Sequence, residues 1–471
     1  MKVCLIYPLV SKEISHKEYD NNIPFPPLGL AYIAAVLKKN NHKVKIIDRN
    51  KILKQNDLNL ALTDEITLNL IKEFSPSIVG FGATTPLMWD VDHFSKIVKK
   101  NFPNIITVCG GPHPTSETDS TLKNCTSIDI AVAGEGELTA LELANGLPLE
   151  EIKGLSFRKN GEIITTEHRP LIKDMDSIPF PARELLDMKY YHSYFPSRHV
   201  HERTTSIFTT RGCPYRCNFC AGPVMFEGKV RFHSPGYVVK EVKELLDNYK
   251  FDTIFFADDL FLANRKRAEE ICNLFIKEGI NKRTKWIAQI RTELVEPDLL
   301  HLMKKAGCLQ VEFGFESGSQ RMLDIMNKKH KVEDYYRVAK TAHGCNMRFQ
   351  CNLIIGYPGE KEDDLIKTID FIREIKPTVT QVSCLWPLPG TRVYKELLTK
   401  GFDLAWDSKT SCASFNFTDM PDEKFKHLSG ILMDEAVKLN WKNYKAYHFR
   451  HNLPHMFELA AQKAKRLLKI K

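Results

Sequence analysis

The sequence lacks the segments that would place a chain in a membrane or outside the cell. No run of about 18 apolar residues occurs among its 471 residues, so no membrane-spanning helix is expected. The first residues, MKVCLIYPLV, hold a short apolar run that is typical of a buried strand and not of a signal peptide. Because no leader is recognised, the 12 cysteines predict a cytoplasmic protein whose thiols stay free or bind metal.

The sequence also lacks a compositional bias. Charged residues make up 27% and hydrophobic residues 43% of the chain, which is an ordinary globular balance. The net charge of +9 is modest for this length, so we expect no specific nucleic-acid partner. A chain of this length exceeds what one compact core usually holds, and two or three domains are expected.

Residues 1–145 alternate short apolar segments with helical patterns. Five segments predict strands, namely KVCLIYP, KVKIID, SIVGFGA, ITVCGG and IDIAVAG. Five strands joined by helices predict a doubly wound, flavodoxin-like parallel sheet covered on both faces. Ligands of such sheets bind beyond the carboxyl ends of the strands, where backbone can approach them closely. The candidate positions there, each also readable as a plain tight turn, are Gly82, Thr85, Gly110, Gly111, Gly134 and Gly136.

The rest of the chain predicts three further regions. Residues 146–200, rich in proline and aromatic residues, are interpreted as a structured connector. Residues 201–415 hold six strand–helix units, fewer than the eight of a closed barrel, and predict an open (βα)6 partial TIM barrel. Residues 416–471 are predicted to be a helical segment. The fold class is therefore α/β throughout, with this helical end.

Three cysteines lie within eight residues of the stretch TTRGCPYRCNFCAG, at positions Cys213, Cys217 and Cys220. A structural zinc site usually takes four ligands, often as two pairs, and no fourth cysteine is near. Three thiolates in one loop suit a [4Fe-4S] cluster that keeps one iron without a protein ligand. Such an iron can bind and activate a substrate. The other cysteines are scattered and are interpreted as small buried hydrophobes.

This spacing, following a predicted first strand, resembles the signature of the radical S-adenosylmethionine (SAM) superfamily. The resemblance implies that the three cysteines hold a [4Fe-4S] cluster whose open iron chelates the amino and carboxylate groups of SAM. It also implies an electron donor such as flavodoxin or ferredoxin, because an electron from the cluster cleaves SAM to a 5′-deoxyadenosyl radical.

The resemblance extends along the predicted barrel. Phe219 lies where the family places an aromatic residue beside the adenine of SAM. The stretch FGFESGSQRML is similar to a family segment in which Glu316 and Ser317 would face the ribose or carboxylate of SAM. Arg291, in QIRTE, would supply a cation to that carboxylate. The stretches NLIIGYPGE and PLPGTRVYKEL are similar to segments of the cobalamin-associated branch.

The predicted N-terminal sheet, with the stretches PPLGLAYIAAVLKKNNHKVKIID, GGPHPT and AGEGE, resembles the cobalamin-binding domain of that branch. The pattern D-x-H-x-x-G, which supplies a histidine below the cobalt, is missing. Its nearest match, WDVDHFSK, places His93 inside a predicted helix, where we interpret it as a surface histidine. The branch includes members that bind cobalamin without such a histidine, so the resemblance still implies this cofactor.

The function that the resemblance implies is radical methyl transfer to an unactivated position of a small-molecule or lipid substrate. A radical oxidoreductase or cyclase without net methylation is the alternative, and a non-catalytic binding module is a further one. The complete cysteine motif argues against the last. Cys351 and Cys384 are candidate hydrogen-atom donors inside the barrel. Asp258 and Asp259 are candidates for the substrate pocket or, alternatively, helix caps.

The last stretch, PHMFELAAQKAKRLLKIK (residues 454–471), predicts a helix with an apolar stripe and a basic face. Such a helix can lie on an anionic membrane surface, which would give peripheral membrane contact and suit a lipid substrate. The alternative is a terminal helix that packs its stripe on the parent domain.

Overall fold

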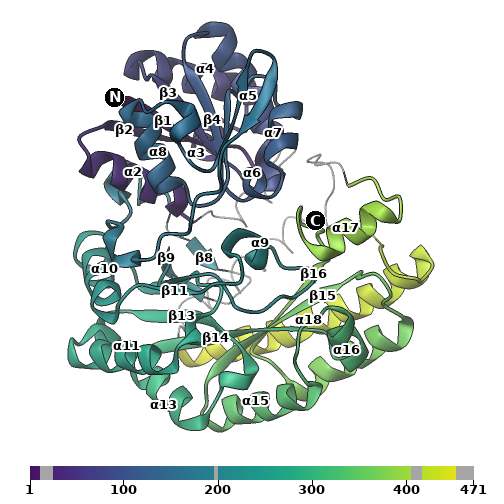
Figure 1. Ribbon diagram of the computed structural model, residues 1–471. Helices are drawn as coiled ribbons and strands as arrows, with labels where there is room; N and C mark the ends of the chain where they lie inside the picture. Colours follow the sequence, from purple (N-terminus) through teal and green to yellow (C-terminus); the bar gives the residue numbers. More distant parts are fainter. Residues whose placement is uncertain (11–24, 192, 196–199, 405–415, 452–471) are drawn as a thin grey trace, which may run out of the picture.

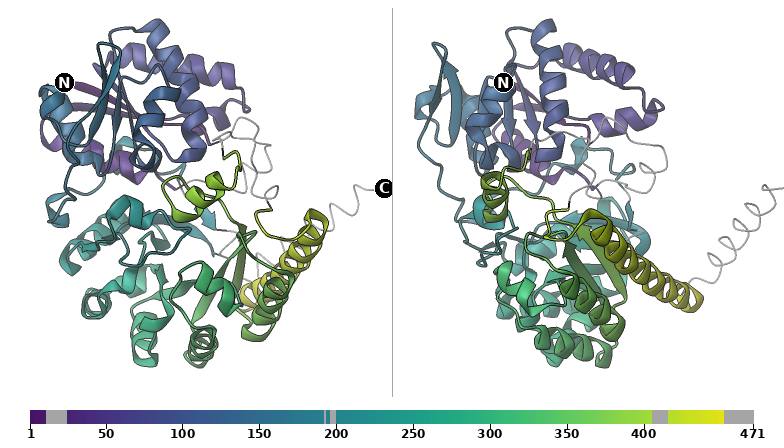
Figure 2. Two further views of the ribbon diagram at one scale, coloured as in Figure 1. Left: turned by 45° about the vertical axis from the view of Figure 1, so that its right-hand side comes forward. Right: turned by 90° about the vertical axis from the view of Figure 1, so that its right-hand side faces the viewer.

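The structure is a computed structural model that describes residues 1–10, 25–191, 193–195, 200–404 and 416–451. Two α/β bodies lie against each other, each built on a seven-stranded sheet (Figure 1). The long helix α18 (Asp422–His451) runs along the second body (Figure 2). No helix in the described ranges combines the length and the apolar character needed to cross a membrane.

The first body contains the predicted flavodoxin-like sheet. Its strands run parallel in the order β2-β1-β3-β4-β5. Their bounds are β1 (Lys2–Tyr7), β2 (Lys43–Asp48), β3 (Ile78–Gly82), β4 (Ile106–Gly110) and β5 (Ile130–Val132). Successive side chains of β1 point to opposite faces of the sheet, and those on both faces are apolar, so helices cover both sides. Val3 and Leu5 pack toward α2 (Leu28–Lys39) and α8 (Gly136–Asn145).

The opposite face of β1 packs on other helices. Cys4 and Ile6 belong to the core with α4 (Leu60–Phe74) and α5 (Met88–Asn101). The doubly wound layer predicted from the sequence is thereby confirmed.

An antiparallel hairpin extends this sheet beyond β5. It consists of β6 (Leu155–Lys159) and β7 (Glu162–Thr165), which lie in the stretch interpreted above as a connector. Its turn is formed by Asn160 and Gly161, with φ of 51° and 86°. An Asn-Gly pair with positive φ at both positions is the sequence signal of such a turn. The predicted connector did not include this hairpin.

The second body contains the predicted open barrel. Six parallel strands follow one another in the order of the chain, and the short β8 (Ser193–Phe195) pairs antiparallel with the first of them. The six are β9 (Val200–Ile207), β12 (Thr253–Phe256), β13 (Lys285–Ile290), β14 (Cys308–Glu316), β15 (Arg348–Ile355) and β16 (Val379–Cys384). Five helices cover the outside, namely α10 (Pro235–Asn248), α11 (Arg265–Lys277), α13 (Pro297–Lys305), α15 (Val332–Gly344) and α16 (Glu362–Ile375).

Helix α18 covers the open edge of this second sheet. The amide of Asn440 accepts the N–H of Thr380 at 2.6 Å and donates to the carbonyl of Thr380 at 2.8 Å. Leu428 and Leu432 of the same helix are buried in the hydrophobic core between the second sheet and its outer helices. The predicted C-terminal helical segment is thus present over the described residues, while the stretch 454–471 lies outside them.

Candidate active site

The cysteine-rich stretch forms a loop between two short strands. Strands β10 (Thr210–Arg211) and β11 (Arg231–Phe232) pair antiparallel, and the cluster loop, defined here as residues 212–230, runs between them with helix α9 (Gly222–Phe226). Gly212 begins the loop with φ of 94°, and a Cβ there would lie 2.1 Å from the carbonyl oxygen of Lys229. Only glycine allows this turn and this close approach.

The three cysteines of the loop lie close to one another. Cys217 is buried, while Cys213 and Cys220 are half-buried. Burial, and to a smaller extent the neighbouring thiols, raise the pKa of Cys213, and they raise the pKa of Cys220 to about 11. In the described part of the chain no three His, Cys, Asp or Glu side chains converge on a single metal ion. A cubane cluster binds each thiolate to a different iron, so its ligands need no common point.

Backbone contacts hold the cluster loop on the barrel. The N–H of Asn218 donates to the carbonyl of Met326 at 2.9 Å, and its own carbonyl accepts the N–H of Val393 at 3.1 Å. Cys220 Sγ accepts the N–H of Gly222 at 3.3 Å, which favours a thiolate at this position. The loop is therefore shaped by main-chain bonds from α14 (Gln320–Ile325) and α17 (Arg392–Thr399) and their flanks.

Two of the predicted SAM contacts belong to one charged network beside the cluster loop. The guanidinium of Arg291 lies 3.3 Å from the ring centre of Tyr215 and donates to the carbonyl of Lys328 at 3.0 Å. Lys328 Nζ in turn lies 2.6 Å from Glu316 Oε1, and Glu316 has φ of 64° at an irregular point of the β14–β15 pairing. Lys328 was missed by the sequence analysis, since its position depends on the fold of the whole loop.

The other two predicted SAM contacts are engaged in packing. Phe219 lies beside an apolar cluster that includes Met322 and Tyr357. Ser317 is 1% exposed and its hydroxyl lies 3.1 Å from that of Thr368 on α16. The contacts of Phe219, Arg291, Glu316 and Ser317 with SAM stay predictions.

Asp258 and Asp259 hold the backbone that leads into the cluster loop. Asp258 is buried and accepts the N–H groups of Thr209 at 2.6 Å and Thr210 at 2.9 Å. Burial raises its pKa to about 6. Asp259 accepts the N–H of Gly212 at 2.8 Å. Neither carboxylate caps a helix, and Asp259 lines the cavity described next.

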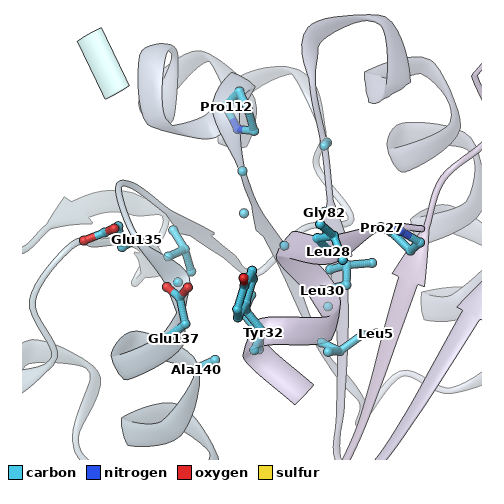
Figure 3. A pocket seen from close by; sticks show the side chains of 18 of the residues that line it. Leu5, Pro27, Leu28, Leu30, Tyr32, Gly82, Pro112, Glu135, Glu137 and Ala140 are labelled. Atoms are coloured by element: carbon cyan, nitrogen blue, oxygen red, sulfur yellow. The ribbon is translucent and has the colours of Figure 1, made fainter. Parts of the chain in front are cut away.

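A cavity of about 580 Å³ lies between α2, α8 and the strand ends of the first sheet (Figure 3). Five of the positions predicted to approach a ligand line it, namely Gly82, Gly110, Gly111, Gly134 and Gly136. Thr85 lies outside this lining, in a short 3-10 turn where its hydroxyl is 3.1 Å from His113 Nδ1. Whether the six residues contact cobalamin stays a prediction.

The lining of the cavity suits a large apolar group that lies between the sheet and its helices. Val3, Leu5 and Val108 form its floor. A Cβ at Gly111, where φ is 112°, would lie 2.8 Å from the carbonyl oxygen of Ala83, so glycine keeps this wall open. The hydroxyl of Tyr32 is buried on the wall without a hydrogen-bond partner in the described ranges, and a ligand could supply one.

No described residue of the cavity lining is a histidine. His93 lies on α5, where its Nε2 is 2.7 Å from Asp64 Oδ2 and a third of its side chain is exposed. The candidate hydrogen-atom donors are also placed elsewhere than expected. Cys351 and Cys384 belong to the core between the sheet and the outer helices, so they point away from the barrel interior.

The comparisons with known proteins agree with this geometry. Residues 207–372 match the model of the radical SAM superfamily, and residues 23–144 match that of the B12 binding domain. An uncharacterized methyltransferase of Pyrococcus horikoshii is 33% identical, with 96% of this chain and 93% of the relative covered. An anaerobic magnesium-protoporphyrin IX monomethyl ester cyclase of Cereibacter sphaeroides is 28% identical, with 92% and 68% covered.

A solved structure shares the fold. It is that of the radical SAM methyltransferase TsrM of Kitasatospora setae with cobalamin and a [4Fe-4S] cluster, at 17% identity and a TM-score of 0.68. The similarity covers 85% of this chain and 75% of that one. The three-cysteine loop and the glycine-walled cavity suit the cofactors of this family, a [4Fe-4S] cluster, SAM and cobalamin. The chain belongs to the radical SAM superfamily, in the branch that carries a cobalamin-binding domain.

Proposed function

We propose that the protein is a methyltransferase that adds a methyl group to an unactivated position of a small polar molecule. The observation that carries this proposal is the wall shared by the two cofactor regions. Asp259 and Arg211, from the barrel, line the same cavity as Gly82 and Gly111 of the first body. Asp259 also binds the N–H of Gly212, next to Cys213. A methyl donor in the cavity and a radical generator at the cluster loop would thus face one reaction space.

When bound, the cofactors supply the radical that removes a substrate hydrogen and the methyl group that replaces it. The chain supplies position and shielding. The bonds of Asp258 and Asp259 fix the start of the cluster loop, and the network of Arg291 and Glu316 presents charges beside it. These groups would orient the carboxylate and ribose of SAM.

The inner face of the barrel supports a polar substrate. Val311, Phe313 and Phe349 pack toward the outer helices, so the alternation of side chains turns Gln310, Glu312 and Gln350 inward. Gln350 Nε2 donates to Asn352 Oδ1 at 2.7 Å and to Gln381 Oε1 at 3.1 Å. Gln310 Nε2 donates to Gln350 Oε1 at 3.3 Å. The side-chain amides and the one carboxylate on this wall could hydrogen-bond to hydroxyl, amide or amino groups of a substrate.

The opposite wall of the barrel is apolar. Phe255 and Ile287 are buried there, and Phe25 stacks on Phe255 with ring centres 5.8 Å apart. A substrate with one flat or apolar side and several polar groups fits between the two walls. A long acyl chain would instead cover the amides, which would lose their hydrogen bonds to water at a cost in free energy. We therefore favour a polar small molecule over a lipid, in the cytoplasm, with reduction by a flavodoxin or ferredoxin.

The second candidate function is a cyclisation or oxidation without net methylation. The 28% identical relative described as a cyclase favours it, because it matches across both bodies of this chain. The two reactions differ in how they consume SAM. Methyl transfer of this kind uses one SAM as methyl donor and another as radical source, so it releases S-adenosylhomocysteine together with 5′-deoxyadenosine.

The test is a product analysis of the full chain reconstituted anaerobically with iron, sulfide and cobalamin. It is incubated with a reductant, SAM carrying a deuterated methyl group, and a set of small polar metabolites. We expect S-adenosylhomocysteine and 5′-deoxyadenosine in about equal amounts, and a labelled product. A substrate that releases 5′-deoxyadenosine while no label leaves SAM would contradict methylation and favour the second candidate.

A further inference from the structure

The acidic residues of the AGEGE stretch have a role that its glycines do not explain. Glu135 directly precedes α8 and Glu137 lies in its first turn, both on the wall of the cavity (Figure 3). Each side chain is only 6% exposed. Buried carboxylates need charged or hydrogen-bonding partners. Here the charged partners come from the other body of the molecule, while the N–H of Ile172 also donates to Glu135 Oε2 at 2.7 Å.

Both carboxylates bind arginines at the ends of the cluster loop. Arg211 Nη1 lies 2.9 Å from Glu135 Oε1, and Arg211 Nη2 lies 2.6 Å from Glu137 Oε1. Arg231 Nη1 lies 2.6 Å from Glu135 Oε2. Arg211 is followed directly by Gly212 and Cys213. Because two N–H groups of one guanidinium bind two different carboxylates, both the position and the orientation of the Arg211 side chain are fixed.

The two arginines are cross-strand partners. Arg211 pairs with Arg231 in the β10–β11 ladder, where the cluster loop leaves the barrel and returns to it. Like charges in such a pair repel one another, and the two carboxylates offset this repulsion. Glu135 therefore holds both ends of the loop at once.

Further contacts dock the same loop on the first body. Helix α9, which follows the three cysteines, packs on α6 (Pro112–Ser116). The guanidinium of Arg211 lies 5.2 Å from the ring centre of Tyr32, a cavity residue of α2. The loop that would carry the cluster thus rests on the loops and helices that line the cavity.

We propose that Glu135, Glu137 and Arg211 are positioning residues that fix the cluster relative to the cofactor cavity of the first body. A desolvated, multiply bonded charge cluster allows little displacement, and radical chemistry between two cofactors requires a fixed separation. The proposal concerns the geometry between the two sites and does not depend on which substrate is methylated.

The test is the double variant Glu135→Gln, Glu137→Gln in the full chain. Without cofactors, amide hydrogen exchange in peptides covering residues 208–232 should accelerate at least about tenfold. With the cluster and cobalamin loaded, pulsed electron paramagnetic resonance between the reduced cluster and Co(II) should give a broader distance distribution than in the wild type. Iron content should stay unchanged, because none of the three cysteines is altered.

The matched control is Glu241→Gln, which breaks a buried pair of the same kind whose two residues do not line the cavity. Glu241 Oε1 lies 2.7 Å from Arg183 Nη2, and the two side chains are 1% and 0% exposed. This control should lower stability while exchange at 208–232 and the distance distribution stay as in the wild type. Should the double variant fail to fold, Arg211→Lys keeps the charge, loses one arm of the fork, and should give an intermediate broadening.

Two results would overturn the proposal. One is a double variant whose exchange at 208–232 and cluster-to-cobalt distances match those of the wild type. The other is a control that alters both as strongly as the double variant does, because the effect would then follow from lost stability alone.

Discussion

The two mainly parallel sheets of this molecule line their inner spaces with different side chains, apolar ones in the first body and, on β14 and β15, amides and a carboxylate in the second. The first turns Val3, Leu5 and Val108 toward its cavity, while the second turns Gln310, Glu312 and Gln350 into the barrel. Both sheets place their working loops at the carboxyl ends of parallel strands, as such architectures do. The difference therefore lies in the alternating side chains and not in the backbone.

Under the proposed function, this difference in side chains matches what each sheet would bind, a cofactor at the first sheet and a substrate at the second. A resident cofactor can be held by shape and by the burial of apolar surface, which give affinity without direction. A substrate has to be distinguished from similar molecules, and buried hydrogen-bonding groups reject those that leave them unpaired. Under the proposed function, the first sheet would retain the cofactor and the second would select the substrate, and mutations should separate the two tasks.

The largest effect is expected from removal of the thiols on the second body. The triple variant Cys213→Ala, Cys217→Ala, Cys220→Ala should lose its iron, its visible iron–sulfur absorption and all cleavage of SAM, because a cubane needs these thiolates. Cobalamin affinity, a property of the first body, should stay within about threefold of the wild type. Iron analysis, product chromatography and a cobalamin titration measure the three quantities. A full cluster in this variant would contradict the assignment of the cysteines.

The next effect concerns the first sheet alone. Gly111→Ala should weaken cobalamin binding at least about tenfold, because its Cβ would press on the carbonyl of Ala83 beside the cavity. Gly161→Ala is the matched control, since Gly161 also has positive φ but no atom within 4 Å of its Cβ. Both positions have positive φ, so both variants bear backbone strain, but only the change at Gly111 adds a close contact beside the cavity. Equal cobalamin affinities in the two variants would show that the glycine wall does not contact the cofactor.

Much of this contrast could be predicted from the sequence, because local patterns carry it. The periods of apolar residues predicted β1 to β5 and the six barrel strands, and the spacing of Cys213, Cys217 and Cys220 predicted the cluster loop. The hairpin of β6 and β7 carried an Asn-Gly signal as well, but its strands are short and partly charged, so the predicted connector did not include a hairpin.

Contacts between distant segments could not be predicted. Arg211 and Glu137 are 74 positions apart and meet only because the two bodies dock. The row formed by Gln310, Gln350 and Gln381 depends on the register of three strands, which no single segment encodes. The same holds for Ser317, whose bond to Thr368 depends on how α16 packs.

A third prediction uses a buried acid in the turn between β15 and α16. Burial raises the pKa of Glu360 from 4.5 to about 8, while its Oε2 accepts the N–H of Gly356 at 2.7 Å. Between these two pH values the unfolded chain releases this proton and the folded chain keeps it, so stability falls as pH rises. Below pH 4.5 and above pH 8 the effect levels off. The loss across the window is at most about 5 kcal/mol.

Glu360→Gln removes this titration. The variant should gain in urea midpoint relative to the wild type as the pH is raised from 5 to 8, and the difference should be small at pH 5. Parallel midpoints at all pH values would mean that Glu360 is ionised in the folded protein.

The smallest effect concerns how the second sheet ends. The first sheet closes with the hairpin of β6 and β7, whereas the edge strand β16 is capped by the amide of Asn440 on Thr380. The amide of Asn443, on the same helix, donates to the carbonyls of the two residues before the strand. Asn440→Ala should cost about 2 kcal/mol, because it leaves a buried N–H and carbonyl unpaired. Lys438→Ala, on an exposed position of the same helix, should change stability by less than about 0.5 kcal/mol. Thermal unfolding and light scattering measure stability and self-association, since an uncapped edge strand can also pair with a second chain. If both variants unfold at the same temperature as the wild type, the edge of the barrel is protected by the packing of Leu428 and Leu432 and not by the amide of Asn440.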